Sequence, residues 1–105
     1  MSSFRFGDFI LVPKERKLTR NGIELNLGAR AFDMLSFLVA NRHRVLTKAE
    51  ILDAIWPDIA VEESNLTVQV SALRKALGPK SLATIPGRGY QFVLSVEESA
   101  PVAEA

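Results

Sequence analysis

The hydrophobic and polar positions of residues 4–27 follow the pattern of short β-strands. Aromatic and aliphatic side chains dominate residues 4–12, and Pro13 ends that run. Asn21-Gly22 is a strong hairpin signal, because both residues tolerate the positive φ angles of a type I′ turn. Apolar and polar side chains then alternate over residues 23–27, as in a strand with one solvated face. The pattern predicts a small antiparallel sheet with short connections.

The period changes to that of a helix over residues 29–42. Apolar side chains recur there at the spacing that gives a helix one buried face. The members of this face are Ala31, Phe32, Leu35, Leu38 and Val39. His43 is the single histidine and follows directly. Because no cysteine, second histidine or carboxylate cluster is near it in the sequence, we interpret His43 as a turn residue and not as a metal ligand.

A second helix is expected to begin with a capping box. Thr47 can accept a hydrogen bond from a backbone N–H of the first turn, and Glu50 can reach back to the residue that caps the helix. Pro57 limits the helix to about Trp56. Residues 57–61 then form a connecting loop.

Residues 62–78 carry the most informative pattern of the chain. At about 100° per residue, the apolar side chains fall on one narrow stripe that we expect to be buried. The stripe consists of Leu66, Val70, Leu73 and Leu77. The opposite face consists of Ser64, Val68, Ser71, Ala72 and Lys75, with Asn65 and Gln69 on one flank and Thr67 and Arg74 on the other. Gly78 followed by Pro79 stops the helix.

The outward face of this helix is unusually poor in charge. A solvated helix face typically carries Glu and Lys side chains four residues apart. Short uncharged side chains instead let a helix backbone approach the DNA major groove, where the methyl groups of Val68 can contact a thymine methyl. A helix with few charges, or one that packs on another protein, fits the periodicity equally well.

Two β-prone runs near the C-terminus predict a hairpin. Residues 82–85 and 90–93 flank the turn 86–89, which contains two glycines and places Arg88 at the tip. Residues 97–105 are small, acidic and include a proline, so they read as a flexible tail or linker after a domain over residues 1–96.

Composition and charge narrow the function classes. The length of 105 residues predicts one domain, and the lack of cysteine excludes disulfides and thiolate metal sites. No apolar run approaches the roughly 18 residues of a membrane span, and a cytoplasmic location is expected. Nine bases balance nine acids up to Glu63, whereas residues 64–96 hold four bases and no acid. Such a stretch is expected of a surface that faces phosphates, with chance as the alternative.

Three separated motifs resemble the OmpR/PhoB-type winged-helix DNA-binding domain of bacterial transcription regulators. They are LTKAEILDAIW at 46–56, the Val, Ser, Leu, Arg and Lys pattern at 68–77, and PGRGYQF at 86–92. The resemblance covers nearly the whole chain and implies an α+β fold. That fold is a winged helix-turn-helix with an N-terminal antiparallel sheet, three helices and a C-terminal hairpin wing.

The resemblance also implies double-stranded DNA as the partner, with the helix at 62–77 in the major groove and the wing at 84–92 in the minor groove. The predicted contact residues are Lys48, Trp56, Ser64, Asn65, Val68, Gln69, Ser71, Ala72, Arg74, Lys75, Thr84 and Arg88. Of these, Lys48, Arg74 and Lys75 are expected to contact phosphates. Packing between helices is an equal alternative for Trp56. Relatives often carry arginine where this chain has Ser64, Ser71 and Ala72, and the family's wing arginine aligns with Pro86. We therefore expect weak binding unless the protein dimerises on DNA or binds neighbouring sites.

The position of the motifs is more similar to ToxR/CadC-like regulators, whose DNA-binding domain is N-terminal. On that basis the chain is a freestanding domain or part of a longer regulator. The longer regulator would have a C-terminal sensor or effector domain and, in some cases, a membrane tether. Loop 57–61 aligns with a region that contacts RNA polymerase in some family members.

There are two competing hypotheses. In one, the chain is a degenerate winged helix that docks on a protein. In the other, the chain is an enzyme. No nucleophile–base pair, phosphate loop or metal spacing supports the enzyme, and no cofactor is expected.

Overall fold

The computed structural model describes residues 3–99 and divides the chain into two compact units. The described part of the first unit comprises residues 3–27 and 94–99, and the second comprises residues 28–93.

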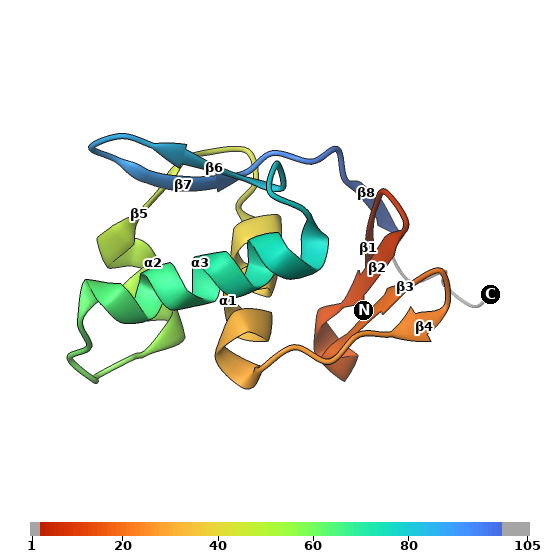
Figure 1. The fold of residues 1–105 in the computed structure, drawn as a ribbon, viewed down its shortest axis with the longest axis horizontal. Helices are drawn as coiled ribbons and strands as arrows, with labels where there is room; N and C mark the ends of the chain where they lie inside the picture. The colour runs from red at the N-terminus through yellow and green to blue at the C-terminus, as the bar shows by residue number, and fades with distance from the viewer. Residues whose placement is uncertain (1–2, 100–105) are drawn as a thin grey trace. The chain divides into compact units, whose positions relative to one another are not determined.

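The first unit is a five-stranded antiparallel sheet (Figure 1). Its strands in spatial order are β4 (Ile23–Glu24), β3 (Lys17–Arg20), β2 (Phe9–Val12), β1 (Ser3–Phe6) and β8 (Glu97–Ser99). The short 3-10 helix η1 (Pro13–Glu15) connects β2 to β3. Alternation along the strands buries one set of aromatic and aliphatic side chains, as the sequence predicts. That set is Phe4, Phe6, Phe9, Leu11 and Leu18.

The turn before β4 is confirmed, but the strand after it is shorter than expected. Asn21 and Gly22 have φ angles of 52° and 83°, both positive as a type I′ turn requires. β4 ends at Glu24, and Ile23 is 70% exposed. The amide of Leu25 still donates to Leu18 O over 2.8 Å, after which no ladder continues over residues 26–27. An edge strand has one partner, so the alternating pattern there did not ensure burial.

The segment that we expected to be a flexible tail begins instead with a strand. β8 pairs with β1 in antiparallel register, with Phe4 opposite Glu98 and Arg5 opposite Glu97. The expectation for residues 97–99 was therefore wrong, and residues 100–105 lie outside the described part of the chain. Glutamate is depleted in β-strands. The pairing of this three-residue strand therefore depends on the free edge of β1 rather than on its own sequence.

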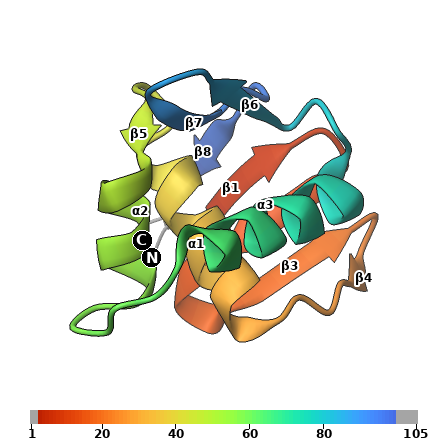
Figure 2. The ribbon, with the colours of Figure 1, turned by 60° about the vertical axis from the view of Figure 1, so that its left-hand side comes forward.

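The second unit contains three α-helices and a three-stranded sheet (Figure 2). The helices are α1 (Ala29–Ala40), α2 (Lys48–Ile55) and α3 (Glu63–Leu77), and the strands are β5 (Leu46–Thr47), β6 (Leu82–Ile85) and β7 (Gly89–Phe92). β7 is the central strand, with β5 and β6 antiparallel on either side of it. The helices contact one another pairwise through buried apolar side chains. The predicted α+β class and the order of helices and hairpin are confirmed.

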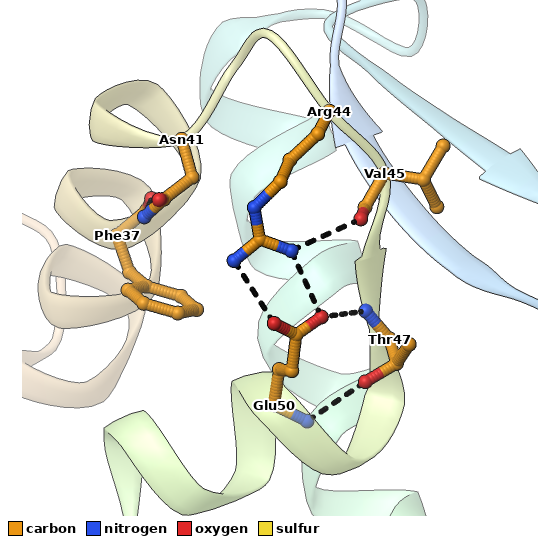
Figure 3. A network of polar contacts seen from close by, with 6 residues as sticks. All are labelled: Phe37, Asn41, Arg44, Val45, Thr47 and Glu50. Carbon is orange, nitrogen blue, oxygen red and sulfur yellow. Dashed lines mark hydrogen bonds and ion pairs between the residues drawn. The ribbon is translucent and has the colours of Figure 1, made fainter.

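The start of α2 is fixed by a polar network (Figure 3). The amide of Glu50 donates to Thr47 Oγ1 over 3.0 Å, and the amide of Thr47 donates to Glu50 Oε1 over 2.9 Å. This is the predicted capping box. Arg44 also donates to both carboxylate oxygens, with an Nη2–Oε2 distance of 2.9 Å. The hydrogen bonds from Arg44 and from the Thr47 backbone lower the pKa of Glu50 from an ordinary 4.5 to about 2.

The contact between β5 and β7 requires a glycine. A Cβ atom on Gly89 would lie 1.9 Å from the carbonyl oxygen of Leu46, which is far inside van der Waals contact. The pairs Leu46–Tyr90 and Thr47–Gly89 therefore form only because position 89 has no side chain. This register joins the beginning of α2 to the hairpin β6–β7.

Candidate nucleic-acid interface

Helix α3 separates a buried stripe from an exposed face, as its sequence period predicts. Leu66, Val70, Leu73 and Leu77 are its buried residues. Val68 on the opposite face is 60% exposed, although it is a large apolar side chain. Exposing an aliphatic side chain forfeits the free energy of burying it, so a partner that covers Val68 gains that contribution.

The other predicted contact residues differ in exposure. Ser64, Asn65, Ser71, Lys75, Thr84 and Arg88 are exposed; Lys48, Gln69, Ala72 and Arg74 are half-buried; Trp56 is buried. The outward face of α3 thus remains accessible over most of its length. Its charge comes at the C-terminal end, where Arg74 and Lys75 lie in the last turn.

The Arg74 side chain joins α3 to the hairpin. Its Nη2 atom donates to Leu82 O over 3.0 Å and to Thr84 Oγ1 over 2.8 Å, both on β6. The guanidinium is therefore engaged within the protein, and its buried Nε atom has no acceptor among the described residues. Both Arg74 and Thr84 are predicted DNA contacts, and the structure shows that they also hydrogen-bond to each other and so join β6 to the last turn of α3.

Trp56 at the C-terminal cap of α2 is 9% exposed. The guanidinium carbon of Arg30 lies 5.9 Å from the centroid of its ring, within the range of a cation–π contact. Arg30 Nη1 also donates to Ile55 O over 2.8 Å. These contacts support the packing alternative for Trp56 and leave little of its ring available to a ligand.

Arg88 lies in an exposed turn between β6 and β7. Its amide donates to Ile85 O over 2.9 Å, with Pro86 and Gly87 between them, and Gly87 has a φ of +74°. Proline followed by a residue of positive φ is the arrangement of a type II turn. The turn is therefore conformationally defined, and it presents the Arg88 side chain to solvent.

The segments that carry Lys48 and Arg88 are neighbours. Thr47 pairs with Gly89, so Lys48 and Arg88 each stand one residue beyond the end of this ladder. Lys48 Nζ lies 2.6 Å from Glu63 Oε2, which links the first residue of α2 to the first residue of α3. The hydrogen bond to Glu63 and its negative charge raise the pKa of Lys48. The start of α3, the start of α2 and the turn at Arg88 are thus connected.

The family model described as "Transcriptional regulatory protein, C terminal" matches residues 22–92. The chain belongs to this OmpR/PhoB-type family. The chain is 33% identical over 98 residues to the transcriptional activator CadC of Escherichia coli, covering 88% of this chain and 19% of CadC. It is 36% identical to the phosphate regulon regulatory protein PhoB of Rhizobium meliloti, covering 84% of this chain and 41% of PhoB. The chain therefore spans less than half the length of either relative.

A solved structure agrees with the family assignment. The DNA-binding domain of E. coli CadC superposes with a TM-score of 0.80 and 30% sequence identity, covering 92% of this chain and 96% of that domain. The expected winged-helix fold of the OmpR/PhoB type is thereby confirmed.

Sequence reasoning missed two features of this OmpR/PhoB-type domain. In the sequence Glu63 is only the last of nine acids before the acid-free stretch, whereas in the structure it pairs with Lys48. Arg74 was expected to contact phosphate, and its Nη2 atom additionally donates two hydrogen bonds to β6. Neither partner lies within one helical turn in the sequence, so no local spacing signals these contacts. Within residues 3–99 no group of acidic or histidine side chains could hold a metal ion, and no helix is long and apolar enough to cross a bilayer.

Proposed function

We propose that this OmpR/PhoB-type domain reads double-stranded DNA in a sequence-specific manner, with α3 in the major groove. The observation that carries the proposal is the face of α3 opposite its buried stripe. That face is accessible and nearly free of charge, and it presents Val68 at 60% exposure. Short side chains allow the close approach that base contacts require. The description of the CadC structure as a DNA-binding domain supports the same function.

The proposed base readers are Asn65, Val68, Gln69 and Ala72, with Ser64 and Ser71 beside them. Amide side chains can bond the N6 and N7 edge of adenine, and the valine methyl groups suit the thymine methyl. Arg88 is proposed to enter the minor groove, because its turn has a defined conformation and is exposed, and a narrow groove attracts arginine.

The proposed phosphate contacts are Lys48, Lys75 and the first backbone amides of α3. The stretch 64–96 contains no acidic residue, so its surface does not repel the DNA backbone. Arg74 acts in this proposal mainly as a positioning residue for the wing, since its Nη2 already donates to Leu82 and Thr84. With few arginines on α3, we propose that tight binding requires a dimer or adjacent sites.

Loop 57–61 is a proposed contact for RNA polymerase. Ile59 in this loop is 55% exposed, and Asp58 adopts a left-handed conformation with a φ of 61°. The loop thus holds an apolar side chain outward at a defined bend. We further propose that the domain acts on DNA in the cytoplasm of a bacterium, has no catalytic activity of its own, and is joined to a sensor or effector domain in a longer regulator.

Fluorescence anisotropy at two salt concentrations tests the proposal, using a labelled duplex recovered from a randomised pool. We expect affinity to fall as salt rises, with a slope of about −0.9 per phosphate neutralised. Lys75→Gln should make the slope shallower by about 0.9, because one phosphate contact is lost. Lys14→Gln is the matched control, since Lys14 is an exposed lysine outside the proposed interface. Absent or salt-insensitive binding would favour protein docking instead.

A further inference from the structure

The ion pair between Lys48 and Glu63 stands in the proposed DNA-facing region. Lys48 Nζ lies 2.6 Å from Glu63 Oε2, a short charge-assisted hydrogen bond. The two side chains are 44% and 59% exposed, so both are open to exchange with solvent and with a ligand. An ammonium group bonds the oxygen of a carboxylate and the oxygen of a phosphate in the same way.

The position of the pair explains why a phosphate would compete for it. Lys48 directly follows Thr47, which pairs with Gly89, and Arg88 precedes that glycine. Glu63 is the first residue of α3. The pair therefore lies where α3 begins and where the wing turn is anchored, which is where a DNA backbone must pass for α3 to enter a groove.

A second ion pair nearby shows why Lys48–Glu63 is the exchangeable one. Glu50 accepts from two nitrogens of Arg44 and from the amide of Thr47, so its removal would also uncap α2. The contact of the Glu63 carboxylate with Lys48 rests on one flexible lysine side chain. Releasing Lys48 therefore costs one exposed ion pair and leaves the helix caps intact.

We infer that Glu63 is an intramolecular competitor of DNA phosphate: it occupies Lys48 in the free domain and thereby limits affinity. This inference rests on the proposed DNA-binding function. Binding exchanges the carboxylate of Glu63 for a phosphate oxygen on Lys48, and it leaves Glu63 as an acid beside the backbone. Glu63 thus weakens sequence-independent attachment, so that base contacts by α3 decide which sites are held.

The test is a set of anisotropy titrations with a fluorescein-labelled duplex of mixed sequence at two salt concentrations. The variants are Glu63→Gln, Lys48→Gln and the double variant, with Glu62→Gln as the matched control. Glu62 is exposed and precedes Glu63, and its substitution removes the same charge without touching the ion pair. Thermal unfolding of each variant establishes that the fold is retained.

We expect Glu63→Gln to tighten binding by roughly two- to fivefold, the range that corresponds to an exposed ion pair. The salt slope should stay close to that of the wild type, because Lys48 contacts a phosphate in both complexes and only the release of Glu63 is saved. In the Lys48→Gln background the gain should fall to that of Glu62→Gln.

Equal gains from Glu62→Gln and Glu63→Gln in both backgrounds would show a general effect of charge and overturn the inference. Weaker binding by Glu63→Gln would overturn it as well, since Glu63 would then hold Lys48 ready for the phosphate. In both of these outcomes the wild-type domain still binds DNA, and the proposed function stands. Failure of the wild-type domain to bind the duplex at either salt concentration would remove the proposed function together with the inference.

Discussion

Arg74 Nη2 lies 2.8 Å from Thr84 Oγ1, so the last turn of α3 is hydrogen-bonded to the first strand of the hairpin. The same atom donates to Leu82 O over 3.0 Å. One side chain therefore sets the position of the wing relative to the helix proposed to read DNA. Because both elements would have to contact the same duplex, their relative position matters for binding as well as for stability.

Substituting Arg74 should reduce both the affinity for DNA and the stability of the fold. Hydrogen bonds that involve a charged group contribute about 1.5–3 kcal/mol, so we expect Arg74→Met to lower the free energy of unfolding by roughly 1–3 kcal/mol. Thr84→Val removes only the side-chain acceptor and should cost less than half as much. Urea denaturation measures both. Equal stability of Arg74→Met and the wild type would show that the wing is held by other contacts.

Gly89 is predicted to be the least replaceable residue of the hairpin. An added Cβ would lie 1.9 Å from Leu46 O, so Gly89→Ala must separate β5 from β7. Overpacking of this kind typically costs about 1–3 kcal/mol, and a backbone contact places it at the upper end. Gly28→Ser is the matched control, because Gly28 is the N-cap of α1 with a φ of −60° and open space around it. Thermal unfolding should show a lower midpoint for Gly89→Ala alone.

The contribution of Glu50 to stability should be lost in acid. Arg44 and the Thr47 backbone lower the pKa of Glu50 to about 2 in the folded protein, from an ordinary 4.5. Because folding lowers this carboxyl pKa, the contribution of ionised Glu50 to the free energy of unfolding is complete above pH 4.5. That contribution is lost as the pH falls toward 2. The difference in unfolding midpoint between wild type and Glu50→Gln should therefore shrink across this window. A difference that stays constant down to pH 2 would contradict the assignment.

The strand β8 should contribute to the first unit. Its three pairs with β1 place Glu98 opposite the buried Phe4. A chain that stops at residue 96 should unfold at a lower temperature than the full chain, because β1 then becomes an unpaired edge. A chain that stops at residue 99 is the control and keeps the strand. Identical melting of the two truncated chains would mean that the pairing adds no stability.

The sequence predicted the parts of the fold that depend on local chemistry. The period of α3, the capping box at Thr47 and the turn at Asn21-Gly22 each require only residues close together in the chain, and all three are confirmed. β8 was missed because its stability comes from β1, which is distant in sequence. Long-range pairing of this kind leaves no periodic signal in the strand itself.

The same distinction applies to the candidate interface. The outward face of α3 follows from helical geometry, and the structure leaves it accessible. The partners of Arg74 and Lys48 are ten and fifteen residues away, on other elements. Side-chain charge suggested a phosphate for each of them, but the folded chain supplies its own acceptors. Tertiary contacts thus add a link to β6 for Arg74 and an ion pair with Glu63 for Lys48.

In the proposed function, the exposed face of α3 determines which DNA sequence is bound. The most direct test is selection from a randomised duplex pool by the wild-type domain and by Val68→Ala, Gln69→Ala and Arg88→Ala. We predict that the α3 variants enrich a different sequence or lose preference at one or two positions, each worth about 1–3 kcal/mol. Arg88→Ala should keep the wild-type preference and bind all duplexes more weakly. Unchanged preference and affinity in all three variants would contradict the account.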